Sequence, residues 1–232
     1  ILLAACVSGS ADIIFSNDPV VLGTVTMSYS GLGASSTMSI WAGDWTGQNV
    51  PAGAILMNKT AGTGLGEYIN NGITGVFCID LLQTIQSSNI VYNIISTADG
   101  PRPAAFLGGG MGQTKANYLS ELWGRYFDPS WTAGGSYTTS QKQAAEAFAA
   151  AVWEIVYEDV PASPMYWDVT VDGTAGDKGF RAANLNSTLA NSWLHSLDGT
   201  GPMADLRVLT NDCSQDFIFA IPEPATLAFA AC

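Results

Sequence analysis

Residues 140–159 have the sequence SQKQAAEAFAAAVWEIVYED and decide the fold, because they predict a long helix that other elements must cover. Ser140 and Gln143 have the spacing of a capping box, which places the start of this helix at Ser140. Apolar residues then recur at steps of three and four, so they form one stripe along the helix. The stripe consists of Ala145, Phe148, Ala149, Val152, Trp153 and Val156.

The rest of the helix surface is predicted to differ from this stripe. Lys142, Glu146 and Glu154 fall on other faces and are expected to point away from it. Three consecutive alanines at 149–151 leave the backbone bare, so a packing partner can approach closely. Ala149 is expected to lie in the middle of that contact.

Composition limits what such a helix can belong to. The chain has 232 residues, 25 glycines, 9 Phe, 7 Trp and 8 Tyr, and 12% of its residues are charged. These values favour a turn-rich, largely β protein with helical insertions over a helical bundle. The formal net charge is −12 with only eight Lys and Arg, which argues against nucleic acid and anionic membranes as partners.

Short alternating or β-branched runs predict strands around the helix. The glycines in 31–33 are expected to end the first strand, and 75–85 and 90–97 are expected to be adjacent central strands. Two further helices are predicted at 117–127 and 185–197. The remaining predicted strands are 21–29, 37–43, 54–58, 166–173 and 216–221. The predicted fold class is therefore α+β: a mainly antiparallel sandwich or barrel-like sheet with about three packed helices in one domain.

Both ends of the chain look like processing signals. The opening ILLAACVSGSAD resembles the end of a secretory signal peptide with a small-residue cleavage site, so 1–11 is expected to be a remnant of one. A lipobox at 3–6 with a lipidated Cys6 is the alternative. The globular body is then 12–220, followed by a tail at 221–232.

The four cysteines divide between these segments. Cys6 lies in the leader and Cys232 in the tail, which leaves Cys78 and Cys213 in the body. A disulfide between them is possible in an exported chain, but sequence does not supply the Cα separation that a bridge requires. The alternative is that Cys78 is a small buried residue.

The tail carries the first resemblance to a known family. Residues 221–227, IPEPATL, follow SQDFIFA and resemble the start of the PEP-CTERM sorting tail of exosortase systems, with Pro222, Glu223 and Pro224 as the motif. The resemblance implies an exosortase-type enzyme as a partner and a secreted or outer-envelope location. It also implies contact with a membrane only through a helix that would continue beyond Cys232.

The body carries a second resemblance, over about 76–196. The segments FCIDL and FAAAVWEIVYE are similar to the thioester domains of bacterial surface adhesins, in which a strand Cys couples to a Gln of a Gln-x-x-Ile-Trp motif. Cys78 matches the nucleophile, and Trp153 matches the motif Trp. The Gln position then falls on Ala149, so the resemblance implies a retained scaffold without the internal thioester.

Other glutamines do not replace the missing one. Gln143 lies six residues before Ala149 and about 120° away around the helix. Gln83 and Gln86 are close to Cys78 in sequence, but nothing in their spacing favours them.

Further candidate sites are weaker. A nucleophile pair of Cys78 and His195 would need an orienting Asp or Asn, and His195 is expected to be solvated or to interact with a helix dipole. The set Asp168, Asp172 and Asp177 could supply oxygens to Ca²⁺ but matches no EF-hand spacing. No metal or cofactor is expected. Four tryptophans could stack on sugars, although large aromatics are more often core: Trp41, Trp45, Trp131 and Trp167.

The sequence thus predicts an exported, non-enzymatic protein that acts in adhesion or in the extracellular matrix. Its expected ligand is an extracellular polysaccharide or a surface protein. A carbohydrate-binding module on the same sorting tail is the main alternative, and a cysteine-dependent enzyme is the next. Aromatics that converge on one exposed groove would favour the carbohydrate module, and a low-pKa Cys78 beside a base would favour the enzyme.

Overall fold

A long bent hairpin is the frame of the molecule. The computed structural model describes residues 19–42, 45–102, 110–171 and 179–221. β1 (Gly23–Ala42) pairs with β2 (Trp45–Gly64) along its whole length. The expected break at the glycines of 31–33 is wrong, because the pairing only shifts register there. A bulge bends a paired strand without ending it.

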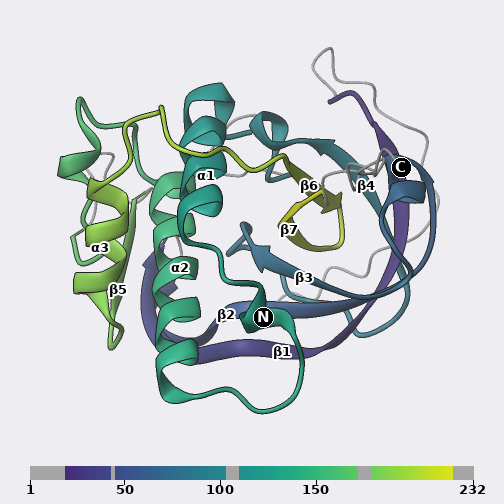
Figure 1. Ribbon diagram of the computed structural model, residues 1–232, viewed down its shortest axis with the longest axis horizontal. Helices are drawn as coiled ribbons and strands as arrows, with labels where there is room; N and C mark the ends of the chain where they lie inside the picture. The colour runs from purple at the N-terminus through teal and green to yellow at the C-terminus, as the bar shows by residue number, and fades with distance from the viewer. Residues whose placement is uncertain (1–18, 43–44, 103–109, 172–178, 222–232) are drawn as a thin grey trace, which may run out of the picture.

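One end of this hairpin closes into a ring, which occupies the right half of Figure 1. Among the described residues, six antiparallel strands follow the order β1, β2, β3, β7, β6, β4 and back to β1. The expected adjacency of 75–85 and 90–97 is wrong, because the strands there, β3 and β4, are separated by β7 and β6 in the sheet. The bounds of these strands are β3 (Gly72–Cys78), β4 (Ile90–Ser96), β6 (Leu206–Asn211) and β7 (Ser214–Ala220).

The other end of the hairpin carries the helices, in the left half of Figure 1. β5 (Phe180–Ala183) adds to the last residues of β1, and α2 (Thr139–Tyr157) packs across β1 and β2. α1 (Gly112–Tyr126) and α3 (Ser187–His195) pack against α2. Short 3-10 helices complete the chain: η1 (Leu65–Tyr68), η2 (Thr97–Asp99), η3 (Pro129–Thr132) and η4 (Pro164–Tyr166).

The prediction of a strand at 166–173 is wrong for 166–171, the part of it that the structure describes. The described residues there form the end of η4 and a turn, in which Asp168 accepts a hydrogen bond from the Thr170 backbone N–H at 2.9 Å. Side chains of Asp bond to their own backbone two residues on and so favour turns over strands. The neighbouring strand is β5, at Phe180–Ala183.

The helix that decides the fold begins at Thr139, one residue before its predicted start, and its N-cap is Thr138. Its capping box is formed by Thr138 and Gln141: the Thr138 hydroxyl accepts from the Gln141 N–H at 3.2 Å, and the Gln141 side chain accepts from the Thr138 N–H at 3.0 Å. The predicted box at Ser140 and Gln143 is therefore wrong. Both pairs have the required spacing, and only the three-dimensional position of the preceding loop selects between them.

α2 is buried on every side along its second half. All residues from 145 to 157 are buried, so the expectation that Glu146 and Glu154 point away from the covered surface is wrong. Glu154 accepts a hydrogen bond from the Asp168 N–H at 2.9 Å, and Glu158, just past the helix, accepts from the Phe180 N–H at 2.6 Å. Buried carboxylates persist where such donors replace water.

An aromatic cluster joins the ring to the helices. The ring of Phe77 on β3 lies against Trp123, Phe127, Trp131 and Phe148, with centroids 4.9 to 6.3 Å apart. These residues come from α1, α2, η3 and the loop after α1. The predicted α+β class, with a mainly antiparallel barrel-like sheet and packed helices in one domain, is confirmed.

Candidate functional site

The end of β3 brings Cys78 against α2. The Trp153 indole N–H donates to the Cys78 carbonyl at 2.9 Å, and the Cys78 thiol donates to the Asp80 carbonyl at 3.2 Å. The thiol is buried and free, so the predicted disulfide between Cys78 and Cys213 is wrong. Cys213 is itself disulfide-bonded, but not to Cys78.

A stripe on α2 holds the segment that follows β3. Ala149, Trp153 and Tyr157 are spaced by four residues, so they lie one above the other on the same helix face. The Tyr157 hydroxyl accepts from the Leu81 N–H at 2.7 Å and donates to the Ile79 carbonyl at 3.3 Å. Ala149 is buried one turn before Trp153 and carries only a methyl group. The position aligned with the acyl donor therefore lies on the same helix face as Trp153 and Tyr157.

Electrostatics at this site disfavour a thiolate. Burial raises the pKa of the Cys78 thiol well above its usual range, and the Asp80 carboxylate adds to the rise, while hydrogen bonding from Trp153 opposes it. A thiol becomes nucleophilic when its pKa falls, so this environment disfavours the thiolate form of Cys78.

Two buried carboxyl groups lie near the thiol. Burial raises the pKa of Asp80 to about 6 and that of Asp216 to about 8, and the charge of Asp80 adds to the rise at Asp216. Asp216 accepts hydrogen bonds from the backbone N–H groups of Asn211, at 3.1 Å, and Arg102. One oxygen of Asp80 accepts from the Leu82 N–H at 2.8 Å, while Oδ2 is buried and has no partner among the described residues.

The predicted partners of Cys78 lie elsewhere. His195 Nε2 contacts the Trp167 carbonyl at 2.8 Å, at the end of α3, so the structure gives the imidazole and the thiol separate partners. The Gln83 side chain donates to the Asp212 carbonyl at 3.2 Å, and Gln86 and Gln143 are exposed. The hydrogen bonds of His195 and Gln83 therefore go to groups other than the Cys78 thiol.

The structure describes one of the three aspartates that were considered as Ca²⁺ ligands. Asp168 accepts from Thr170 and Asn191, whereas Asp172 and Asp177 lie outside the described residues. Within the described part of the chain, no cluster of three or more His, Cys, Asp or Glu could hold a metal ion.

The four tryptophans do not line one groove. Trp131 and Trp167 are buried, and Trp131 belongs to the aromatic cluster around Phe77. Trp45 donates its indole N–H to the Leu81 carbonyl, and the Trp41 ring lies under the guanidinium of Arg181 at 4.4 Å. Each indole thus has its own structural contacts.

Three residues of this region were not singled out from the sequence: Tyr157, Asp80 and Asp216. Tyr157 follows Trp153 by one helical turn, and Asp80 follows Cys78 by two residues, so spacing could have indicated both. Asp216 lies far along the chain, and nothing in its local sequence connects it with Cys78. Only the closure of the ring brings β7 next to β3.

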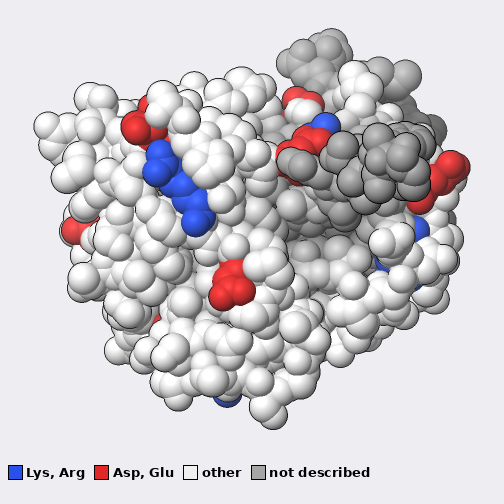
Figure 2. Space-filling model, in the orientation of Figure 1, with Lys and Arg blue, Asp and Glu red and all other residues white. Residues whose placement is uncertain are grey.

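Comparison of the chain with protein-family models, curated proteins and solved structures gave no match. In the part of the chain that the structure describes, no helix has the length and hydrophobicity needed to cross a bilayer. Figure 2 shows one face of the molecule on which Lys and Arg occur in small separate groups. The predicted signal-peptide remnant at 1–11, Cys6, Cys232 and the predicted sorting motif Pro222, Glu223 and Pro224 lie outside the described residues.

Proposed function

We propose that the protein is an exported, non-enzymatic module of the cell surface or extracellular matrix, with a thioester-domain-like body that lacks the internal thioester. The hydrogen bond from Trp153 to the Cys78 carbonyl, 2.9 Å long, carries the proposal. It joins the two motif halves that the sequence resemblance connects. Ala149 lies one turn before Trp153, where the resemblance requires a Gln.

The environment of the thiol supports a non-enzymatic role. Cys78 is buried, its pKa is raised by burial, and its hydrogen-bond partner is a backbone carbonyl. A cysteine enzyme needs a thiolate and a base within reach of it. The protein is then a binding module, and an exosortase-type enzyme that acts on residues 222–224 is its processing partner.

Restoring the acyl donor tests the proposal. In Ala149→Gln, the Cys78 sulfur should attack the Gln side-chain carbonyl carbon, forming the thioester bond and releasing one ammonia molecule. Preorganised neighbours replace much of the entropic cost of a bimolecular step, so the reaction needs no added enzyme. Intact mass spectrometry should therefore show the loss of ammonia from Ala149→Gln and not from the wild-type protein.

The matched control is the double variant Cys78→Ala, Ala149→Gln, which keeps the glutamine and removes the sulfur. Its mass should show no loss of ammonia. The larger side chain overpacks the core at a cost of about 1–3 kcal/mol, so circular dichroism must first show that the variants fold. A folded Ala149→Gln protein with a free thiol would refute the alignment, and ammonia loss in wild type would refute the loss of the thioester.

A further inference from the structure

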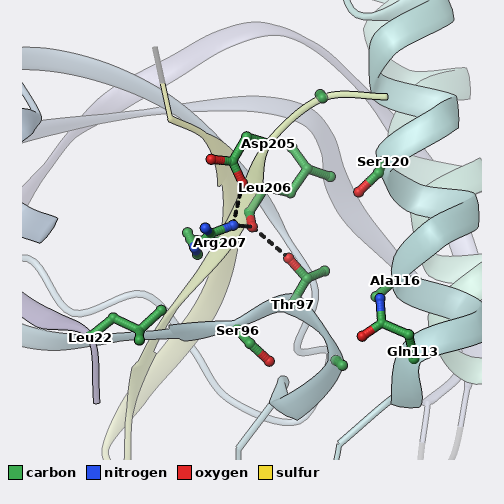
Figure 3. Close-up of a pocket in the computed structure, with 11 residues that line it drawn as sticks. Leu22, Ser96, Thr97, Gln113, Ala116, Ser120, Asp205, Leu206 and Arg207 are labelled. Carbon is green, nitrogen blue, oxygen red and sulfur yellow. Dashed lines mark hydrogen bonds and ion pairs between the residues drawn. The ribbon is translucent and has the colours of Figure 1, made fainter. Parts of the chain in front are cut away.

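A polar pocket opens between α1, η2 and the start of β6. Its volume is about 270 Å³. α1 contributes Gln113, Ala116 and Ser120, whose spacing by three and four residues places them on one helix face. Figure 3 shows Thr97 opposite this face, with β6 beside it. The small side chain of Ala116 leaves the room that the pocket occupies.

An ion pair completes the wall that faces α1. Asp205 and Arg207 are two residues apart at the start of β6 and pair directly with each other. Arg207 also donates to the Leu206 carbonyl at 2.6 Å, whereas its Nε is buried without a hydrogen-bond partner among the described residues. Because this Nε is buried it is closed to a ligand, whereas the Asp205 side chain is 54% exposed.

The remaining polar groups of the wall offer both donors and acceptors. The Thr97 hydroxyl donates to the Leu206 carbonyl at 2.9 Å, so its oxygen can still accept. The Gln113 amide donates to Asn117 at 2.7 Å, which leaves its carbonyl oxygen as an acceptor. The Ser120 side chain lies on the same wall as Gln113, with Ala116 between them along α1 (Figure 3).

This wall fits a small neutral ligand with several hydroxyl groups. The charge of Arg207 is balanced by Asp205, and the whole chain carries a net charge of −12, so an anionic ligand is disfavoured. None of the described lining residues is aromatic, so a ligand here is held by hydrogen bonds and not by stacking. Pockets for drug-sized ligands measure roughly 300–1,000 Å³, so this smaller one fits a single sugar ring.

We propose that this pocket binds one neutral sugar unit of an extracellular polysaccharide. Asp205 accepts from one sugar hydroxyl, the Thr97 oxygen accepts from another, and Ser120 and Gln113 bind the ring from α1. The proposal deepens the matrix role proposed above and rests on it for the source of the sugar. Binding is therefore measured with free sugars, whatever the fate of the Ala149→Gln experiment.

The experiment is ligand-observed NMR with four probes: the methyl glycosides of glucose, galactose and N-acetylglucosamine, and glucuronate as the anionic comparison. At least one neutral glycoside should bind more tightly than glucuronate. Failure of all three neutral glycosides to bind, or a preference for glucuronate, overturns the proposal.

Variants locate the binding. Ala116→Leu fills the pocket and should abolish binding, and Ser120→Ala removes one hydrogen bond and should weaken it about fivefold to tenfold. Thr114→Ala, on an exposed position of the same helix, is the matched control and should bind as wild type. Binding that survives Ala116→Leu in a folded protein, or that Ser120→Ala leaves unchanged, places the sugar elsewhere and overturns the proposal.

A final variant tests the role of the ion pair. Asp205→Ala removes the carboxylate and leaves the Arg207 charge unbalanced, so the preference should shift toward glucuronate by more than tenfold relative to the neutral glycoside. An unchanged preference would show that the pair does not select the ligand.

Discussion

Phe77 and Cys78 are consecutive residues of β3, yet they have opposite surroundings. Phe77 packs among aromatic rings of the helical half, whereas Cys78 lies beside the carboxyl groups of Asp80 and Asp216. The first environment stabilises the fold by excluding water from apolar surface, which pH does not change. The second contains ionisable groups in a buried setting, so its contribution depends on their protonation. One strand thus joins the two halves through an apolar contact and a titratable one.

The largest effect is expected when a ring is removed from the aromatic cluster around Phe77. Phe148→Ala removes a ring that touches Phe77, Trp123, Trp131 and Trp193, and it should lower the free energy of unfolding by about 3–5 kcal/mol. Urea denaturation followed by circular dichroism measures the loss, which should be the same at acidic and neutral pH. Phe148→Leu, which keeps most of the volume, should lose less. A loss below about 1 kcal/mol for the alanine variant would contradict the role of this ring.

The next largest effect is a change of stability with pH, which the buried carboxyl groups of Asp80 and Asp216 cause. The folded pKa values of Asp80 and Asp216, about 6 and about 8, lie above the value of 3.8 for an unperturbed Asp, so the folded protein binds more protons than the unfolded chain between these values. The contribution of these two groups to stability is then greatest below about pH 4 and falls as pH rises through 6 and 8. At about 1.4 kcal/mol per pH unit for a fully titrating group, unfolding should become easier by at least about 2–3 kcal/mol between about pH 5 and about pH 7.

Substituting the carboxyl groups separates this effect from the rest of the chain. Asp216→Asn should flatten the fall in stability between about pH 5 and about pH 7, even if the variant is less stable overall. Thr114→Ala, at an exposed and uncharged position of α1, is the control and should keep the wild-type slope. Urea midpoints measured across pH decide between them, and a wild-type slope in Asp216→Asn would show that this group is not the one that titrates.

The smallest effect is expected when a single hydrogen bond is removed, the one from Trp153 to the Cys78 carbonyl. Trp153→Phe leaves the buried Cys78 carbonyl without its donor and should lower the free energy of unfolding by about 1–2 kcal/mol. The rate at which a thiol reagent labels Cys78 should rise in the same variant, because local opening of this segment costs less free energy. Trp41→Phe, where the ring is partly exposed, should change neither quantity. Unchanged labelling in Trp153→Phe would mean that this bond does not hold the segment closed.

Local pattern was sufficient for much of the fold. The apolar spacing in α2 predicted a long covered helix, and the other two helices lie where leucines and aromatics recur at helical spacing. β-branched runs located most strands, but β5 and β6 were missed, although Leu206 and Val208 alternate with Arg207 in β6. Strand order was not predictable, because it depends on which distant segments pair when the ring closes.

The burial of Glu146 and Glu154 shows why the rest could not be predicted. Periodicity measures the hydrophobicity of side chains, so it placed both carboxylates away from the covered stripe. It does not detect backbone donors that arrive from other parts of the chain, such as the Asp168 N–H that bonds to Glu154. The candidate site follows the same rule: sequence brought Cys78 and Trp153 together through a family pattern, while the approach of Asp216 depends on tertiary structure.

The β1–β2 hairpin has a consequence for cooperativity. Its pairing runs, with register shifts on the way, from Gly23 opposite Gly64, inside the ring, to Ala42 opposite Trp45, under the helices. The two halves therefore share both strands of the hairpin, so they are expected to unfold in one transition. Tryptophan fluorescence, which reports mainly on the helical half, and the far-ultraviolet signal of the whole backbone should then give the same urea midpoint.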